Sequence, residues 1–259
     1  MPEVIYEKKD KIAYVTINRP QQMNALNQGV QQGLNDAWQD IEEDPNIFVA
    51  ILTGAGGKAF SAGADLKQME TGDDSGEAVI PSPRRSGGLG PSAGNVTKPV
   101  IAAIDGYCLA GALELALSCD IRVATEASQF GCPEVKWSVL HGYGAQVMPN
   151  TVHMSNVMEL LLTGEFIDAQ EAHRIGLISR IVPAGEHISM AEEIAAKICR
   201  NAPLAIKVTK ELARTRVNQG LAEGMRLYAT LGRMLRTTED SREGPRAFAE
   251  KRQANFKGR

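Results

Sequence analysis

The sequence has no excess of basic residues, few aromatic residues and no long hydrophobic run. Its 259 residues include 28 lysines and arginines against 31 aspartates and glutamates, for a formal net charge of −3. Without a basic excess to neutralise phosphates, nucleic-acid binding is not expected. Aromatic residues make up only 5%, which also disfavours a base-stacking surface. No segment approaches 18 uninterrupted apolar residues, so no membrane span or membrane partner is expected.

Paired cysteine and histidine spacings are missing as well. Cys108, Cys119, Cys132 and Cys199 include no CxxC pair, so we expect reduced, mostly buried thiols. The four histidines form no HxxxH or HExxH pattern, and no metal site is expected. The first ten residues carry charges and no apolar run, unlike a secretory signal peptide. These features together predict a cytoplasmic protein.

Strand and helix patterns alternate in the first half of the chain, and helix patterns dominate the last third. A β-hairpin is predicted over 4–18, followed by a helix that Asn27 caps and that ends near Glu43. Buried strands are predicted at 47–52, 99–105 and 121–124, with a helix at 110–118. Amphipathic helices are predicted at 188–199, 204–217, 221–235 and 240–255. The order predicts an α/β core with a helical C-terminal part.

Residues 71–95 are rich in Gly, Ser and Pro, and we interpret them as a long surface loop. A loop of this composition is expected to become ordered when a ligand binds.

A glycine-rich turn, Gly54–Ala59, follows one predicted strand and fits the GxGxxA form of a dinucleotide-binding turn. A βαβ unit would also need a second buried strand before Asp73 and Asp74, and the sequence has none there. Nucleotide binding is therefore disfavoured.

Two other turns expose small residues directly after predicted strands. They are Phe60–Leu66 and Gly106–Gly111, and the second opens a helix. Small side chains let a ligand approach the backbone closely, and a helix N-terminus offers unpaired N–H donors. The two turns could direct N–H groups at one developing oxyanion. Tight packing of strand on helix is the alternative explanation.

Two glutamates are candidates for acid–base chemistry. Glu114 lies inside an apolar helix, and Glu134 follows a strand and Pro133. A carboxylate among apolar residues is either paired with a base or held for chemistry. Two such glutamates can divide acid and base work, and a buried ion pair is the alternative for either one alone.

Several segments carry a resemblance that extends along essentially the whole chain. They are Asn18–Pro20, Asn24–Leu26, Ala59–Lys67, Gly106–Gly111 with Glu114, Cys119–Asp120, Phe130–Glu134, Glu243–Gly244, Ala247–Phe248, Glu250–Arg252 and Asn255–Phe256. In order and spacing they resemble the crotonase family, also called enoyl-CoA hydratase/isomerase. The resemblance implies an α/β fold: a ClpP/crotonase-like spiral of ββα turns that holds the coenzyme A and acyl site, at 1–190. A helical trimerisation region would follow at 191–259.

The resemblance also implies roles for individual residues. The backbone N–H groups of Ala64 and Gly111 match the family's oxyanion hole, and Glu114 and Glu134 match the two catalytic glutamates of its hydratases. The positions that match coenzyme A binding are Met23, Ala25, Ala62, Ala64, Asp65, Leu66, Lys67, Gly111, Phe248 and Lys251. In the family, the last two positions often act across a subunit boundary.

The activity implied is that of a lyase of fatty acid metabolism, which adds water reversibly across the 2,3 double bond of an enoyl-CoA. The expected partners are the acyl-CoA substrate and further copies of the chain, in a homotrimer or a hexamer of two trimers. No cofactor is expected, because coenzyme A is part of the substrate. The alternatives are a specialised hydroxyacyl-CoA dehydratase, an enoyl-CoA isomerase, a thioester or C–C hydrolase, or a non-enzymatic fold relative.

The loop after Glu134 departs from the family pattern. Ser138, His141 and Ala145 stand where hydratases usually have Gly, Pro and Gly. Because this loop borders the acyl end of the site in the family, His141 and Tyr143 are predicted to face a polar or aromatic acyl group. Packing in the interior or exposure to solvent is the alternative.

Overall fold

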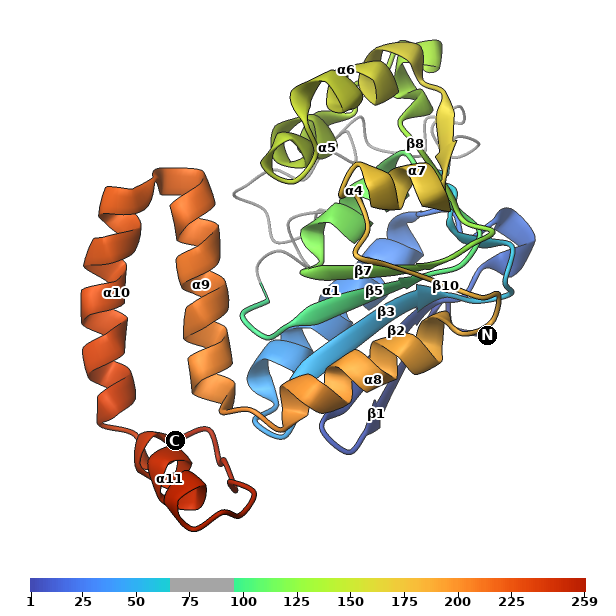
Figure 1. Cartoon of the computed structure of the whole chain (residues 1–259). Helices are drawn as coiled ribbons and strands as arrows, with labels where there is room; N and C mark the ends of the chain where they lie inside the picture. Colours follow the sequence, from blue (N-terminus) through green and yellow to red (C-terminus); the bar gives the residue numbers. More distant parts are fainter. Residues whose placement is uncertain (66–95) are drawn as a thin grey trace.

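The computed structural model describes residues 1–65 and 96–259, and its core is built on two sheets (Figure 1). The larger sheet has six strands in the order β1–β2–β3–β5–β7–β10, and the smaller has four in the order β4–β6–β8–β9. The strands are β1 (Val4–Lys9), β2 (Ile12–Ile17), β3 (Val49–Gly54), β4 (Ala59–Ser61), β5 (Val100–Ile104), β6 (Tyr107–Leu109), β7 (Ile121–Thr125), β8 (Gln129–Gly131), β9 (Phe166–Asp168) and β10 (Arg180–Val182). The loop predicted over 71–95 lies outside the described residues.

The helices follow the predicted distribution, with most of the helical residues in the second half. They are α1 (Gln28–Glu43), α4 (Gly111–Ser118), α5 (Gly142–Val147), α6 (Met154–Thr163), α7 (Ala169–Arg174), α8 (His187–Cys199), α9 (Pro203–Gln219), α10 (Leu221–Arg236) and α11 (Glu239–Ala249). Short 3₁₀-helices are η1 (Pro20–Gln22), η2 (Pro133–Trp137) and η3 (Met148–Asn150). Within the described part of the chain, no helix is long and apolar enough to cross a membrane.

The structure confirms the predicted hairpin and the first helix. Strands β1 and β2 pair antiparallel, with Val4 opposite Ile17 and Lys9 opposite Ile12. The side-chain oxygen of Asn27 accepts a hydrogen bond from the N–H of Val30 at 2.8 Å, and so caps the start of α1.

The strands at the centre of the larger sheet are apolar throughout because both faces of the sheet are covered. On β3, Val49 and Ile51 pack in one buried cluster with Ala191 of α8. Ala50 and Leu52 belong to the cluster on the other face, which includes the buried stripe of α1. Helix α8 lies along one face in Figure 1, as expected for a parallel sheet.

The smaller sheet brings together segments that are far apart in the sequence. Its strands have three residues each. Strands β4, β6 and β8 run parallel, so their carboxyl ends lie at the same edge. Three segments begin at that edge: the turn after β4, helix α4 after β6, and η2 after β8.

The C-terminal helices extend away from the core. In Figure 1, α9 and α10 form an antiparallel pair beside the sheets, with α11 at its far end. The Asp120 carboxylate accepts from Lys210 Nζ at 2.7 Å and from Arg214 at 2.9 Å, and so attaches α9 to the core. Helix α11 ends at Ala249, before the predicted end at 255, and Lys251 then has a left-handed φ of 53°.

The predicted boundary at residue 190 falls inside α8, which packs on the core sheet. The division into a core and a trimerisation region remains a prediction.

Candidate active site

The turn after β4 and the start of α4 are in direct contact. Gly63 has a φ of 91°, and a Cβ atom added to it would lie 2.7 Å from the Cβ of Ala110 and 2.9 Å from the carbonyl oxygen of Leu109. It would also lie 3.2 Å from the backbone nitrogen of Gly111. Only glycine fits between the two turns without moving one of them, so the close approach predicted from the small residues is present.

Two backbone N–H groups have no hydrogen-bond partner among the described residues where the turns meet. Leu26 forms a parallel bridge with the turn: its N–H donates to the Gly63 carbonyl at 2.8 Å, and its carbonyl accepts from the Asp65 N–H at 3.2 Å. The intervening Ala64 N–H and the N–H of Gly111, the first residue of α4, have no acceptor within residues 1–65 and 96–259. A Cβ added to Gly111 would lie 3.9 Å from the Ala64 nitrogen, so the two predicted donors are neighbours.

The backbone at Ala110 is strained at this point. Ala110 has φ 53° and ψ −130°, a combination that side chains disfavour. Its N–H donates to the Gly131 carbonyl at 3.0 Å, which ties the start of α4 to the end of β8. The hydrogen bond and the packing of Gly63 hold the strained residue in place.

Glu114 lies in the first turn of α4, three residues after Gly111, on the same helix face. Its side chain is 10% exposed. One carboxylate oxygen, Oε1, accepts from the Gly144 N–H at 3.1 Å. Burial raises the pKa of Glu114, and the neighbouring Glu134 carboxylate also raises it, whereas His141 and the Gly144 N–H act in the opposite direction. A carboxylate with a raised pKa is a stronger proton acceptor than an ordinary glutamate.

Glu134 lies in η2 with a side chain that is 11% exposed. Its Oε1 is 2.6 Å from Nδ1 of His141, and its Oε2 is buried with no hydrogen-bond partner in the described part of the chain. The same His141 Nδ1 is 3.9 Å from Glu114 Oε1. The structure therefore brings the two predicted glutamates together, with one histidine between them.

The predicted coenzyme A segment is anchored by two side chains whose roles were not predicted. Asn24, fully buried at φ 55°, donates to the carbonyl oxygens of Ala55 at 2.9 Å and Ala59 at 2.7 Å. Arg19 donates to the Ala25 carbonyl at 2.7 Å and to the Asp65 carboxylate at 3.0 Å. The motifs around these residues supported the family resemblance, and the structure shows that they hold the backbone of the site.

The predicted coenzyme A residues do not all lie together. The Ala62 N–H donates to the Met23 carbonyl at 3.0 Å, so the segments 23–25 and 62–65 are adjacent. Leu66 and Lys67 lie outside the described residues. Phe248 and Lys251, at and after the end of α11, are exposed. Helix α11 lies far from α4 within one chain in Figure 1.

The sequence predicted that His141 faces an acyl group, but its side chain packs in the interior, which was the stated alternative. Its ring is 2% exposed, its Nδ1 lies against Glu134, and the ring packs on Gly144, where an added Cβ would lie 1.9 Å from Nε2. Ser138, with φ 58°, ends η2 in the left-handed region and turns the chain back toward Glu134. No spacing rule in the sequence signals this turn, so the contact was missed. Tyr143 is half-buried, and burial raises its pKa.

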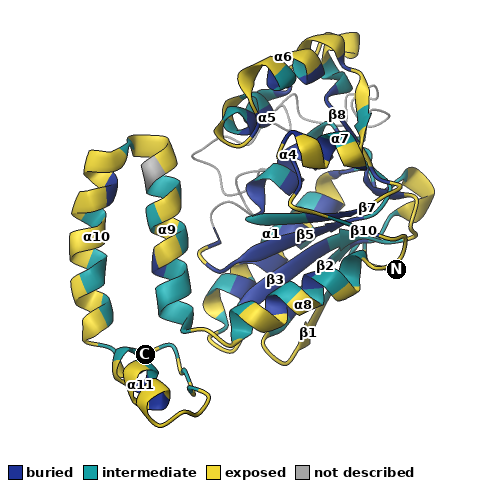
Figure 2. Ribbon diagram, in the orientation of Figure 1, coloured by how far each residue is buried: buried dark blue, intermediate teal, exposed yellow. Residues whose placement is uncertain are grey.

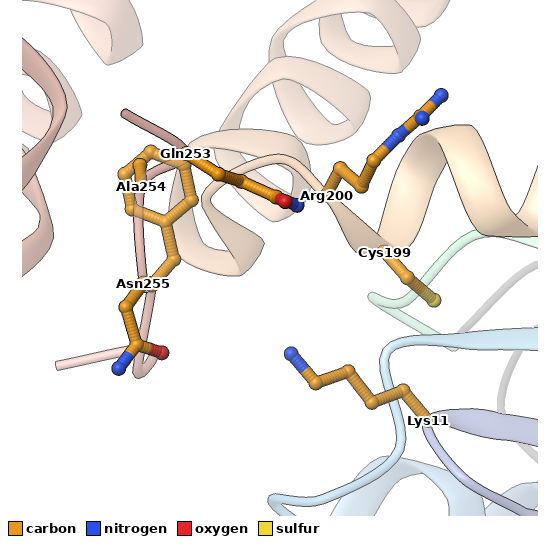
Figure 3. A pocket seen from close by; sticks show the side chains of 7 residues that line it. Lys11, Cys199, Arg200, Gln253, Ala254 and Asn255 are labelled. Carbon is orange, nitrogen blue, oxygen red and sulfur yellow. The ribbon is translucent and has the colours of Figure 1, made fainter. Parts of the chain in front are cut away.

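A separate pocket of about 340 Å³ lies between the β1–β2 turn and the C-terminal segment (Figure 3). Its lining residues are Lys11, Cys199, Arg200, Gln253, Ala254, Asn255 and Phe256. Neither glutamate contributes to it, so this pocket is distinct from the candidate site.

Comparison with known proteins assigns the chain to a family. The family model described as enoyl-CoA hydratase/isomerase matches residues 7–259. The (E)-benzylidenesuccinyl-CoA hydratase of Thauera aromatica is 39% identical over 98% of this chain and 99% of its own length. The short-chain-enoyl-CoA hydratase of Clostridium acetobutylicum is 38% identical over 99% of this chain and 98% of its own.

Solved structures agree with the sequence comparisons. An enoyl-CoA hydratase from Mycobacterium tuberculosis H37Rv superposes with a TM-score of 0.92 at 38% identity and covers 100% of both chains. One from Bacillus anthracis gives a TM-score of 0.92 at 33% identity. The predicted crotonase fold is thereby confirmed, and the chain belongs to the enoyl-CoA hydratase/isomerase family.

Proposed function

We propose that the protein catalyses the reversible syn addition of water across the 2,3 double bond of an enoyl-CoA thioester. One observation carries the proposal: Glu114 of α4, the helix that begins with the Gly111 N–H, meets Glu134 of η2 in a buried cluster with His141. The printed names of two relatives, a short-chain-enoyl-CoA hydratase and a crotonyl-CoA hydratase, describe the same reaction class.

The two unpaired N–H groups would bind the thioester oxygen. As water adds to C3, electron density moves through the conjugated system to this oxygen. Donors fixed in advance at Ala64 and Gly111 stabilise the developing charge, and a single donor of this kind is worth about 3–4 kcal/mol in a transition state. The first N–H groups of α4 also lie at the positive end of the helix dipole.

The two glutamates would divide the proton transfers. Glu114, whose pKa burial raises, accepts a proton from water as the oxygen attacks C3. Glu134 donates its proton to C2, so that one water molecule is added in total. The proton held by Glu114 then passes to Glu134, directly or by exchange with solvent in which Glu114 releases a proton and Glu134 takes one up, and this restores the starting state.

Coenzyme A would lie along the segments that contain Met23, Ala25, Ala62 and Asp65, since the described segments 23–25 and 62–65 are adjacent. The reaction as proposed uses no separate cofactor, because coenzyme A is part of the substrate. The proposal keeps the cytoplasmic location expected from the sequence, which fractionation of cells that make the protein would test.

We further propose that the chain acts as a homotrimer or as a hexamer of two trimers. Leu221, Met225 and Tyr228 of α10 share a helix face and are 62%, 54% and 54% exposed. Figure 2 shows α10 exposed along most of its length, and apolar side chains grouped this way are typical of a surface that another subunit covers. Phe248 and Lys251 would then reach the site of a neighbouring copy. Sedimentation equilibrium tests this: a species of the single-chain mass, 27.9 kDa, would contradict it.

The decisive experiment is a panel of enoyl-CoA substrates that includes crotonyl-CoA and enoyl-CoAs with aromatic or carboxylate-bearing acyl groups. Hydration removes the absorbance of the conjugated thioester. We expect at least one substrate to be hydrated, and Glu134→Gln to lower turnover by about 10²-fold or more. Release of free coenzyme A thiol would instead indicate a hydrolase, and a shifted double bond without incorporation of water an isomerase. If no substrate lost absorbance, the proposal would be wrong.

A further inference from the structure

A third ionisable side chain is in contact with the two glutamates. His141, the residue before α5, places Nδ1 2.6 Å from Glu134 Oε1 and 3.9 Å from Glu114 Oε1. Its side chain is 2% exposed, less than either glutamate. Two nearby groups, Cys132 and Tyr143, both have pKa values raised by burial and are neutral near pH 7. Among the described residues, the charged groups in contact with the imidazole are the two carboxyl groups.

The surroundings of the ring select one tautomer. Nε2 is buried and has no hydrogen-bond partner in the described part of the chain, and it packs on Gly144. A buried N–H without an acceptor costs the desolvation of a donor. The tautomer with its hydrogen on Nδ1 avoids this cost and donates that hydrogen to Glu134 Oε1.

This hydrogen bond distinguishes the two oxygens of Glu134. A free carboxyl group can rotate and can carry its proton on either oxygen, because the terminal torsion of a glutamate is broad. With Oε1 already accepting from His141, the acidic proton belongs on Oε2. Oε2 is the oxygen with no partner in the described part of the chain, so it is the one left for a substrate atom.

We propose that His141 is a positioning residue that fixes the rotation of the Glu134 carboxyl group and places its transferable proton on Oε2. This inference deepens the proposed function and rests on it. Gly144 completes the arrangement: its missing side chain makes room for the imidazole, and its N–H orients Glu114 at 3.1 Å.

The test compares two substitutions of nearly equal shape. In His141→Asn the side-chain NH₂ takes the place of Nδ1 and can still donate to Glu134, whereas His141→Leu has no donor. We expect His141→Leu to lower kcat by about 10- to 100-fold, the range for loss of a hydrogen bond to a charged or acidic group, with KM changed less than about threefold. The asparagine variant should recover most of kcat. His173→Leu, at an exposed histidine, is the matched control and should leave kcat unchanged.

Equal kcat values in the asparagine and leucine variants would overturn the inference, since a purely structural histidine would not need a donor at this position. A second readout is independent of activity: ¹⁵N NMR of the four histidines, with His141 assigned from the variant. We expect hydrogen on Nδ1 and none on Nε2 near pH 7, and hydrogen on Nε2 would contradict the tautomer. If wild type hydrated no enoyl-CoA, the proposed function would fail, and the NMR spectrum would still decide the contact between His141 and Glu134.

Discussion

Replacing Glu114 with glutamine should make the protein more stable at neutral pH while nearly abolishing its activity. The carboxyl group is 10% exposed, and burial raises its pKa despite the nearby His141 and Gly144 N–H. Glutamine keeps the oxygen that accepts from Gly144 and removes the charge. The variant should therefore relieve the cost of a buried carboxylate and lose the proton acceptor.

The sign of the pH dependence follows from the direction of the shift. Because the folded-state pKa lies above the unfolded value of about 4.3, the protonated group contributes its full stability below about pH 4.3. That contribution is lost as the pH rises through the folded-state pKa. The stability of Glu114→Gln relative to wild type should thus increase from pH 4 to pH 8. A gain of about 1 kcal/mol at pH 8 is typical when an unfavourable functional group is removed, and it corresponds to about 2–4 °C in Tm.

Urea denaturation at pH 4 and pH 8 measures the stability of Glu114→Gln relative to wild type. Loss of the absorbance of the conjugated thioester measures its turnover. Turnover should fall by about 10²-fold or more. Glu126→Gln, at an exposed glutamate, is the control and should change neither quantity. A stability difference from wild type that is equal at the two pH values would show that Glu114 does not carry the cost of a buried charge. Near-normal turnover would remove it from the mechanism.

Three further substitutions test the framework of the site. Ala110→Gly should relieve the strain at φ 53° and raise the free energy of unfolding by about 1 kcal/mol; a loss of stability in urea would contradict the strain. Gly63→Ala, with its Cβ 2.7 Å from that of Ala110, should separate the two turns and lower kcat by about 10²-fold, whereas unchanged kcat would show that the contact does not matter. Asp120→Asn should weaken the attachment of α9, leave Lys210 without its carboxylate and cost about 2–4 kcal/mol. Proteolysis near Gly220 at the wild-type rate would refute the last expectation.

The sequence predicted most of the longer helices and strands, because the capping residues and the spacing of apolar residues there match the side chains that the fold buries. Asn27 caps α1 as expected, and the apolar strand at 47–52 was found two residues along, at Val49–Gly54, covered on both faces. The strands of the smaller sheet were not predicted, since three residues carry too little pattern. They exist because their neighbours pair with them. Helix α11 was predicted too long, because the apolar spacing continues past Ala249 while the backbone does not.

The sequence predicted the main residues of the candidate site but not the hydrogen bonds that join them. The two turns and the two glutamates were candidates from their residue types, and the family resemblance assigned roles to Ala64, Gly111, Glu114 and Glu134. The structure shows the two turns in contact and the two glutamates joined through His141. The histidine was expected to face an acyl group. The direction of the His141 side chain depends on the left-handed backbone conformation of Ser138. This conformation is uncommon for residues other than glycine, so it is hard to predict from the sequence.

The most direct test of the account is a crystal structure of the protein with a bound enoyl-CoA or a non-reactive acyl-CoA analogue. The account predicts that the thioester oxygen lies within about 3.2 Å of both the Ala64 and the Gly111 nitrogen, with Glu134 Oε2 facing C2 and Oε1 still on His141. A thioester oxygen beyond hydrogen-bond reach of either nitrogen, or a C2 atom remote from Glu134, would contradict it.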